Sequence, residues 1–429
     1  MPLCLALSTS GVCCVKISAE GLDAYEYIES ALASMEDEID ISIYSIEAAE
    51  LFDILNYILK SSPWLFFVNS SFTYSKNSAG NIKILYPEYT MSRDERAEAF
   101  DFCLYELEKI LFYMPSGMDE FDIVLYLHDY ICALFEYDEE CESRDMYGML
   151  KNKKGTCQGY TYLFLELAKR SGLSCDVVYS DSMCHIWNII KIDGEWYYID
   201  LTWDDGNKLG VVSHKSFLFS DREAEFLGYY GYVTRENRLC VSEKYSGEYL
   251  NNISVPMAYA YGEWYFVQNS ATVRAVSIYN EENDTAQNVI SIDGYWILED
   301  NKIFANCFSS AVSVLGDIYF NTKSKIYKYS HGERIEIYSV PSGVQIYYLV
   351  TDGKNIYFSD GENIDSFSVE SDGDVDGDGK ANLFDIVKLS LAIENNNLCN
   401  LNKPCADISG NAKIENEDLE MLRSMLVGQ

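Results

Sequence analysis

Apolar residues recur with helical spacing in the first part of the chain, between about residues 22 and 117. Residues 48–59 and 93–113 place apolar side chains three and four positions apart, which predicts two helices. Residues 64–67 and 82–86, on either side of a turn-rich stretch, are rich in strand-forming residues and predict two short strands. This region is therefore expected to be mainly helical, and nothing in it points to chemistry.

The pattern changes to helix, loop, helix, strand and hairpin between about residues 118 and 220, which indicates an α+β unit. Its clearest helix begins at Cys157 and ends before Gly172, a residue type that commonly ends helices. The apolar face of this helix comprises Tyr160, Leu163, Phe164, Leu167 and Ala168. Further along, Asp193-Gly194 separates two apolar runs and predicts a two-residue hairpin turn.

Short strands rich in tyrosine, isoleucine and valine follow glycine turns between about residues 225 and 370. The clearest four follow Gly262, Gly294, Gly316 and Gly353, at spacings too irregular to predict a closed propeller. We predict a small β-rich domain here. Its aromatic side chains are suited to sugar binding, but aromatic faces of strands more often form cores.

The length of 429 residues exceeds what one hydrophobic core usually supports, so several domains are expected. The 35 tyrosines favour a mixed or β-rich chain over an all-helical bundle. A formal net charge of -36 repels phosphate backbones, so nucleic acid is not expected as a partner, whereas divalent cations and basic protein surfaces are. Solubility alone is the other explanation for this charge.

Residues 1–20 form an apolar stretch that ends in small residues. This fits a signal peptide that lacks its basic start, and it also fits a buried strand. No later apolar run reaches the roughly 18 residues of a membrane span, so no span is predicted.

The 13 cysteines lack the paired spacing of a zinc ribbon, and most are expected to be buried thiols. Cys399 and Cys405, on either side of a loop that contains proline, are the best candidates for one disulfide bridge.

Cys157 differs from the other cysteines because it opens an apolar helix directly after a lysine-rich loop. The backbone N–H groups and the positive end of the dipole at a helix N-terminus favour thiolate over thiol. Lys151, Lys153 and Lys154 are expected to add to this effect. Taken alone, the same pattern also fits a buried cysteine beside a solvated loop.

The hairpin that follows supplies a base and a carboxylate. With Asp193-Gly194 at its tip, His185 is predicted to face Thr202, and Trp187 to face Asp200. His185 and Asp200 would then be diagonal neighbours on one sheet face, about 7–8 Å apart at the backbone and within reach of a side-chain hydrogen bond.

The candidate catalytic residues are therefore Cys157 as nucleophile, His185 as base and Asp200 as the carboxylate that orients the imidazole. His128 lies on an apolar helix face and is interpreted as a structural core histidine. His214 and His331 have no evident partners in the sequence.

The segment from about residue 118 to 210 resembles the transglutaminase-like core of bacterial secreted proteins, within the papain-like group of cysteine acyl-transfer folds. The matching motifs are His128-Asp-Tyr130, Tyr137-Asp138, Tyr147-Gly-Met-Leu150, Gly155-Thr-Cys157-Gln-Gly-Tyr160, His185-Ile-Trp-Asn188 and Asp193-Gly-Glu-Trp-Tyr-Tyr-Ile-Asp200-Leu-Thr-Trp-Asp-Asp205. The resemblance implies that Cys157 attacks an amide carbonyl with the help of His185 and Asp200, and that water or an amine resolves the thioester. It also implies that Tyr137 shapes the pocket. One position departs from the family pattern, because Ile186 stands where relatives often carry alanine.

A second chemical signature lies near the C-terminus, in an acidic and glycine-rich loop before an apolar helix at residues 385–393. Its oxygen ligands fall at positions 1, 3, 5, 9 and 12 of a calcium loop, with glycine at position 6 and a backbone carbonyl at position 7. The corresponding residues are Asp374, Asp376, Asp378, Lys380, Asn382 and Asp385. The pattern predicts a bound Ca²⁺ ion.

The pattern recurs before a second apolar helix at residues 418–426. The corresponding residues are Asp407, Ser409, Asn411, Lys413, Glu415 and Asp418. This copy is weaker, because Ser409 and Asn411 replace carboxylates and Ala412 replaces the glycine. The duplication implies that the two helices pack together.

The duplicated loop and helix, over residues 372–429, resembles a dockerin, the module that attaches enzymes to cellulosome scaffolds. The resemblance implies that the cohesin domain of a scaffoldin is the partner. The partner-selecting loop positions 10 and 11 differ between the copies, Leu383-Phe384 against Asn416-Glu417, so a symmetric binding mode is not expected.

The two resemblances together predict a fold with an α+β transglutaminase-like, papain-like core, a β-rich domain and a small helical calcium-loop module. They predict a secreted, extracellular, cellulosome-associated enzyme that attacks peptide or glutamine amides in proteins and peptides. The alternatives are a non-catalytic scaffold or adhesion component with the same fold, and a carbohydrate-binding protein that uses the β-rich region.

Overall fold

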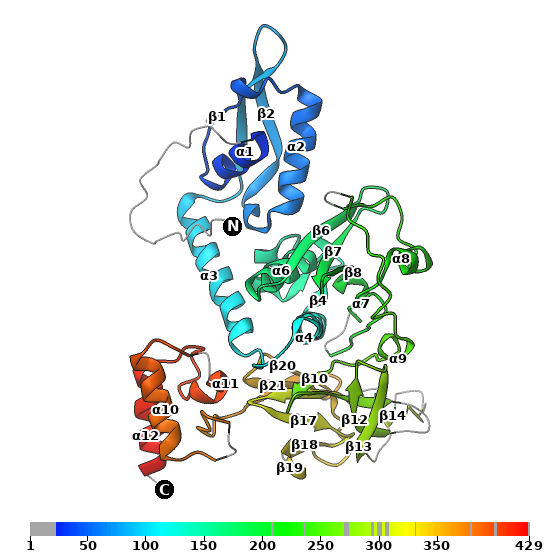
Figure 1. Cartoon of the computed structure of the whole chain (residues 1–429), viewed down its shortest axis with the longest axis vertical. Helices are drawn as coiled ribbons and strands as arrows, with labels where there is room; N and C mark the ends of the chain where they lie inside the picture. Colours follow the sequence, from blue (N-terminus) through cyan, green and yellow to red (C-terminus); the bar gives the residue numbers. More distant parts are fainter. Residues whose placement is uncertain are drawn as a thin grey trace. The chain divides into compact units, whose positions relative to one another are not determined.

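The computed structural model describes residues 23–427 apart from short segments, and Figure 1 shows it as a ribbon. The segments outside the description are 207–209, 235–236, 270–273, 293–295, 298–302, 305–308, 331, 378–379 and 399–400. The signal peptide predicted at residues 1–20 also lies outside the described residues. The chain divides into two compact units, Met1–Asp101 and Phe102–Gln429.

The first unit combines helices with a three-stranded antiparallel sheet of order β1-β3-β2. Its elements are α1 (Ala24–Ala33), β1 (Ile39–Asp40), η1 (Ser42–Tyr44), α2 (Ala48–Ser61), η2 (Pro63–Leu65), β2 (Val68–Lys76) and β3 (Ile82–Tyr89). The apolar faces of α1 and α2 meet the sheet in one core, which includes Ile28, Leu55 and Leu85. The helix predicted at residues 48–59 and the strand predicted at residues 82–86 are both confirmed.

One strand predicted in this unit is wrong. Residues 64–67 fall in the 3-10 helix η2 and the turn after it, and the strand β2 begins only at Val68. Pro63 is the first residue of η2, where its fixed φ and missing N–H favour a helical turn over a sheet ladder. The region predicted to be mainly helical therefore also contains a sheet.

The second unit contains an α+β core. Its central helix, α6, packs against α4 and against a four-stranded sheet. The helix α3 (Arg93–Phe112) crosses the boundary between the two units. The helices of the core are α4 (Glu120–Leu134), α5 (Met146–Asn152), α6 (Cys157–Arg170), α7 (Leu201–Asp204), α8 (Asp221–Leu227) and α9 (Glu248–Asn251). The strands are β4 (Glu136–Tyr137), β5 (Lys154–Gly155), β6 (Ser174–Ser180), β7 (His185–Ile192), β8 (Glu195–Ile199) and β9 (Val233–Thr234), and the sheet order is β8-β7-β6-β9.

The hairpin between β7 and β8 has the predicted turn and register. Asp193 and Gly194 both adopt positive φ, 51° and 86°, which matches a two-residue turn of the kind that fits twisted strands. Asn188 pairs with Ile199, which is the register predicted from the turn.

The pairing does not continue as far as predicted. The strand β8 ends at Ile199 and Asp200 caps the short helix α7, so Trp187 does not pair with Asp200, and His185 does not pair with Thr202. The Asp200 side chain accepts backbone N–H groups of α7, and these bonds turn the chain out of the ladder.

The region after the core is β-rich, as predicted, and consists of antiparallel meanders β10–β13, β14–β15, β16–β19 and β20–β22. The strands are β10 (Ala258–Ala260), β11 (Glu263–Asn269), β12 (Arg274–Asn280), β13 (Thr285–Ser291), β14 (Trp296–Ile297), β15 (Ile303–Phe304), β16 (Ala311–Val314), β17 (Asp317–Asn321), β18 (Lys325–Ser330), β19 (Glu333–Ser339), β20 (Tyr347–Thr351), β21 (Asn355–Ser359) and β22 (Ile364–Ser368). Aromatic side chains such as Tyr265, Phe320 and Phe358 are buried in the cores of these sheets. Their burial agrees with the structural role that was favoured over sugar binding.

The last segment contains α10 (Leu383–Glu394), α11 (Lys403–Ala406) and α12 (Asn416–Val427). As predicted, the helices that follow the two acidic loops pack against each other, and Figure 1 shows α10 and α12 side by side. Cys405 is a buried free thiol near the Asn402 side chain, and Cys399 lies outside the described residues. The disulfide bridge predicted between these two cysteines is therefore absent from the described part of the structure.

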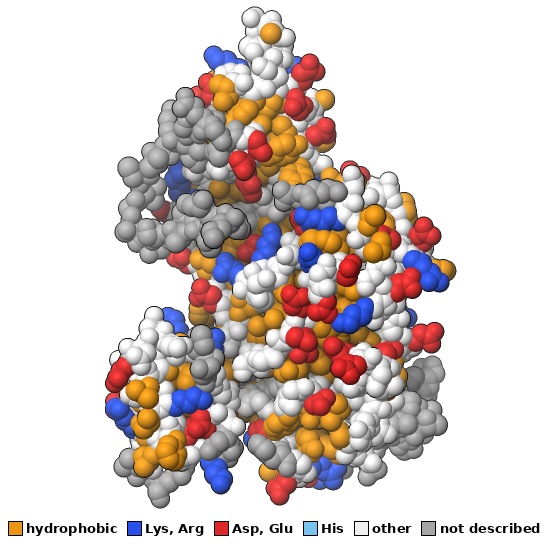
Figure 2. Space-filling model, in the orientation of Figure 1, with side chains coloured by type: hydrophobic (Ala, Val, Ile, Leu, Met, Phe, Trp, Pro, Cys, Tyr) orange, Lys and Arg blue, Asp and Glu red, His pale blue; other side chains and the backbone are white. Residues whose placement is uncertain are grey.

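Within the described residues, no helix is both long enough and apolar enough to cross a membrane. This agrees with the absence of a predicted span. Figure 2 shows acidic side chains scattered over the visible face, with lysine and arginine interspersed among them.

Candidate active site

Cys157 is the first residue of α6 and is partly exposed. Thr156 occupies the N-cap position without a side-chain capping bond, so the first N–H groups of the helix are not satisfied by that side chain. The sulfur therefore lies at the positive end of a 14-residue helix.

The lysines of the preceding loop are engaged elsewhere. Lys153 pairs with Glu106 at 3.1 Å, and Lys154 pairs with Glu136 at 3.5 Å. Lys151 donates to the Tyr147 hydroxyl at 3.2 Å. The two ion pairs offset part of the charge of Lys153 and Lys154, and the contribution of the three lysines to a Cys157 thiolate stays a prediction.

His185 is the first residue of β7 and forms a short hydrogen bond with Asp200, with 2.6 Å between Nε2 and Oδ2. Its ring stacks on Trp187 with 5.5 Å between centroids, and on Trp203 with 5.4 Å between centroids. Trp187 is buried and Trp203 is partly exposed, so the imidazole is held between the core and an aromatic cover. These contacts leave the ring little freedom to rotate.

Asp200 is 1% exposed and has a donor for each carboxylate oxygen. Its Oδ1 accepts the backbone N–H groups of Thr202 and Trp203 at 3.0 and 3.3 Å. Its Oδ2 accepts the Tyr229 hydroxyl at 2.9 Å as well as His185. A buried carboxylate needs such partners, because an unpaired buried charge costs several kcal/mol.

The electrostatics of the site favour the protonated imidazole. Burial alone lowers the pKa of His185, but the hydrogen bond and charge of Asp200, together with the neighbouring Cys157 thiol, raise the pKa to about 10. Because the pKa is raised on folding, the pairing stabilises the fold most below the ordinary imidazole pKa of 6.5, and the stabilisation is lost as the pH rises towards 10. The Cys157 thiol therefore lies beside a cation at neutral pH.

Three residues near the site have roles that the sequence did not fully reveal. Tyr229 lies in a loop whose sequence carries no motif. Trp203 lies in the motif that follows Asp200, but the sequence does not indicate that it stacks on His185. Burial, with a contribution from the Asp200 charge, raises the pKa of Tyr229 far above its usual value, so its hydroxyl stays a donor. Burial raises the pKa of Tyr137, and the nearby Cys157 sulfur adds to this rise. Tyr137 therefore lies close to Cys157, which suits the pocket role that the resemblance implies for it.

The first acidic loop brings Asp374, Asp376 and Asp385 together, with one oxygen of each within 4.8 Å of the others. Asp385 at the start of α10 accepts the N–H groups of Asp376 and Asn382 at 3.0 and 2.7 Å, and these bonds fold the loop around its carboxylate. Three carboxylates this close are a donor set for a hard divalent cation such as Ca²⁺. Asp378 and the predicted position-6 glycine, Gly379, lie outside the described residues, and Lys380 is exposed.

In the second loop, as in the first, the carboxylate at the start of the following helix accepts backbone N–H groups of the loop. Asp407 accepts the N–H groups of Asn411 and Ala412 at 3.0 and 2.9 Å, and Asp418 accepts that of Ser409 at 2.9 Å. Ala412 has a φ of 60°, the left-handed conformation that glycine tolerates best, at the position predicted to need glycine. The Asn411 side chain donates to Glu415, and Lys413 is exposed.

Comparison with known proteins assigns the fold of the segment that carries Cys157, His185 and Asp200. Residues 113–201 match the family model of the Transglutaminase-like superfamily. The chain contains a transglutaminase-like domain. Asp200 is the second-last residue of the match, and Cys157 and His185 lie inside it.

Two curated relatives of the transglutaminase-like domain are the kyphoscoliosis peptidases of Mus musculus and Homo sapiens. The mouse protein is 27% identical over 112 residues, which are 21% of this chain and 17% of that protein. The human protein is 25% identical over 155 residues, which are 28% of this chain and 23% of that protein. The chain thus spans about a fifth of the length of these relatives.

Two solved structures are similar over 38% of this chain. One is the crystal structure of a TGase, with 15% identity, a TM-score of 0.23 and 50% of that chain covered. The other is a Cytophaga hutchinsonii protein assigned provisionally as a cysteine protease, with 12% identity, a TM-score of 0.20 and 71% of that chain covered.

We expect Tyr229→Phe to lower the free energy of unfolding by about 1–2 kcal/mol, because it removes a donor from a buried carboxylate. Urea denaturation at pH 7 measures the loss. Tyr230→Phe is the matched control, since Tyr230 is the exposed neighbour and should change stability little. Equal effects of the two substitutions would contradict the role assigned to the Tyr229 hydroxyl.

Proposed function

We propose that Cys157, His185 and Asp200 form the active site of a cysteine acyl-transfer enzyme of the peptidase or transglutaminase type. The observation that carries the proposal is the imidazole of His185, which is hydrogen-bonded to buried Asp200 and lies beside a thiol at a helix N-terminus. A nucleophile, a base and a carboxylate that orients the base are the parts that this chemistry requires.

The two ring nitrogens of His185 have separate tasks in this mechanism. Because Nε2 is bonded to Asp200, Nδ1 is the nitrogen left to exchange a proton with the sulfur of Cys157. The thiolate attacks an amide carbonyl, and the backbone N–H of Cys157 is a donor for the developing oxyanion. His185 then gives its Nδ1 proton to the leaving amine, and the C–N bond breaks to leave a thioester.

The second half of the reaction restores the enzyme. His185 takes a proton from water or from a primary amine, which attacks the thioester carbonyl. Collapse of the tetrahedral intermediate releases the Cys157 thiolate, with a carboxylic acid or a new amide as product. Peptide bonds and glutamine side chains both present the amide carbonyl that this sequence needs.

We also propose that residues 372–429 bind Ca²⁺ and attach the protein to the cohesin domain of a scaffoldin, outside the cell. The three clustered carboxylates of the first loop support this proposal, as does the packing of α10 against α12. Leu383 and Phe384, at the partner-selecting positions of the first loop, are both exposed, which suits contact with a partner. The secreted, cellulosome-associated location rests on this module.

Alkylation of the folded protein with iodoacetamide, followed by peptide mass spectrometry, measures the proposed activation of Cys157. Cys141 is the internal control, because it is exposed to a similar intermediate degree. We expect Cys157 to react at least about tenfold faster than Cys141 at pH 6, because the thiolate and not the thiol reacts. His185→Gln is expected to remove this advantage.

Equal alkylation rates for the two cysteines would exclude an activated thiolate and favour a non-catalytic scaffold role. Incubation with a peptide library, with and without a primary amine, then separates hydrolysis from amine transfer through the masses of the products. Cys157→Ser protein provides the blank for that measurement.

Asp374→Ala combined with Asp385→Ala is expected to abolish Ca²⁺ binding by the first loop and calcium-dependent cohesin binding. Calorimetric titration with Ca²⁺ measures the first effect, and a pull-down with cohesin measures the second. Asp360→Ala with Asp365→Ala is the control, because it removes the same charge from an exposed hairpin outside the loops. Cohesin binding that persists in excess chelator would contradict the calcium dependence.

A further inference from the structure

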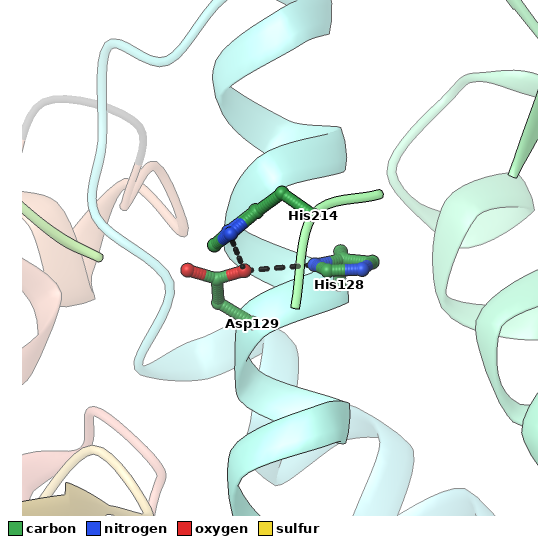
Figure 3. A group of neighbouring side chains, drawn as sticks. All are labelled: His128, Asp129 and His214. Atoms are coloured by element: carbon green, nitrogen blue, oxygen red, sulfur yellow. Dashed lines mark hydrogen bonds and ion pairs between the residues drawn. The ribbon is translucent and has the colours of Figure 1, made fainter. Parts of the chain in front are cut away.

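A second group of ionisable side chains is buried inside the second unit, outside the site of Cys157. His128 and Asp129 are consecutive residues of α4, and His214 lies in the segment after α7. The three residues are 0%, 3% and 0% exposed. Figure 3 shows both imidazole rings directed at the Asp129 carboxylate.

The contacts converge on a single atom. The Oδ1 atom of Asp129 lies 2.8 Å from Nδ1 of His128 and 2.9 Å from Nε2 of His214. One ligand atom of each residue lies within 4.8 Å of the others, as a shared metal ion requires. Zinc bonds of about 2.0–2.1 Å hold tetrahedral ligand atoms roughly 3.3 Å apart, so each imidazole nitrogen would move away from Oδ1 of Asp129 by only about half an ångström.

The second ring nitrogen of each histidine, which faces away from Asp129, also has a hydrogen-bond partner. The Nδ1 of His214 lies 2.9 Å from the carbonyl oxygen of Ile253, and the Nε2 of His128 lies 3.3 Å from Oδ2 of Asp204. A carbonyl can only accept, so His214 donates through Nδ1 and presents Nε2 to Asp129. Metal-binding histidines are oriented in this way, by a carbonyl or carboxylate on the nitrogen that does not bind the ion.

The carboxylate is anchored on its other oxygen. The backbone N–H of Met257 donates to Oδ2 of Asp129 at 2.6 Å, which leaves Oδ1 for the two imidazoles. The contacts from Asp204, Ile253 and Met257 therefore hold the two imidazoles and the Asp129 carboxylate so that they face one another. They come from α7, from the segment before Val255 and from the start of the β-rich region.

Charge balance favours a cation at this point. Two carboxylates, Asp129 and Asp204, contact these imidazoles in a fully buried group. Buried carboxylates are tolerated where a positive charge balances them, and one divalent ion held by the two imidazoles and Asp129 supplies that charge.

We propose that His128, Asp129 and His214 bind a structural transition-metal ion of the Zn²⁺ class. Two imidazole nitrogens and one carboxylate oxygen suit Zn²⁺ or Co²⁺ and not the hard Ca²⁺ ion, which takes only oxygen ligands. The complete burial leaves no access for a substrate, so the ion joins α4 to the segments after α7. This proposal does not depend on the acyl-transfer reaction.

The experiment uses the full chain with Cys157→Ser, which removes the thiol that would otherwise bind zinc beside His185. The protein is stripped with chelator, saturated with Ca²⁺ to fill the acidic loops, and titrated with ZnCl₂. We expect one tightly held zinc per chain by elemental analysis and a rise in melting temperature. His214→Gln is expected to lose the zinc, whereas His185→Gln is the control that keeps it.

Substitution with Co²⁺ supplies a readout that needs no variant of the cluster. Intense visible absorption bands of tetrahedral Co²⁺ in the Cys157→Ser chain support the site even if His214→Gln fails to fold. A Cys157→Ser chain that binds neither Zn²⁺ nor Co²⁺ would overturn the proposal, and the cluster would then be a hydrogen-bonded network without a metal ion. Zinc that stays bound in folded His214→Gln protein would overturn it as well.

Discussion

The carboxylate of Asp200 is the group on which the geometry of the transglutaminase-like domain depends. It is buried, and a buried charge is tolerated only with several donors around it. The donors come from His185 at the start of β7, from Tyr229 after α8, and from two backbone N–H groups of α7. One charge therefore ties a strand, a short helix and a loop together, and the imidazole takes its orientation from that junction.

Rigid elements complete the arrangement on either side of the imidazole. The stacking of Trp187 and Trp203 restricts rotation of the His185 ring, and Cys157 belongs to a helix whose apolar side is buried. In the proposed acyl transfer, groups held by strands and helices would need little rearrangement before reaction, which lowers the entropic part of a barrier. The same rigidity explains how an imidazole can remain protonated in a largely buried position, since Asp200 cannot move away from it.

The two donor sets of the second unit differ in the ion that they suit. The first acidic loop offers carboxylate oxygens close to the surface, near exposed Leu383 and Phe384. The group around Asp129 offers two imidazoles and one carboxylate in the interior. Oxygen-only sets suit Ca²⁺, and mixed nitrogen and oxygen sets suit transition metals, so the two proposed sites differ in the ion that each would select. The strongly acidic composition indicated divalent cations without distinguishing these two chemistries.

The amino-acid sequence by itself determined the features that depend on neighbouring residues. The positive φ values of Asp193 and Gly194 and the resulting register, the apolar face of α6, and the spacing of the two acidic loops all follow from local geometry. Only the tertiary structure decided the contacts between distant residues. Tyr229 reaches Asp200 across 29 positions, His214 reaches Asp129 across 85, and Lys153 turns to Glu106. The physical reason is that turn chemistry and periodicity act over a few residues, whereas the partner of a buried polar side chain is set by how the whole core packs around it.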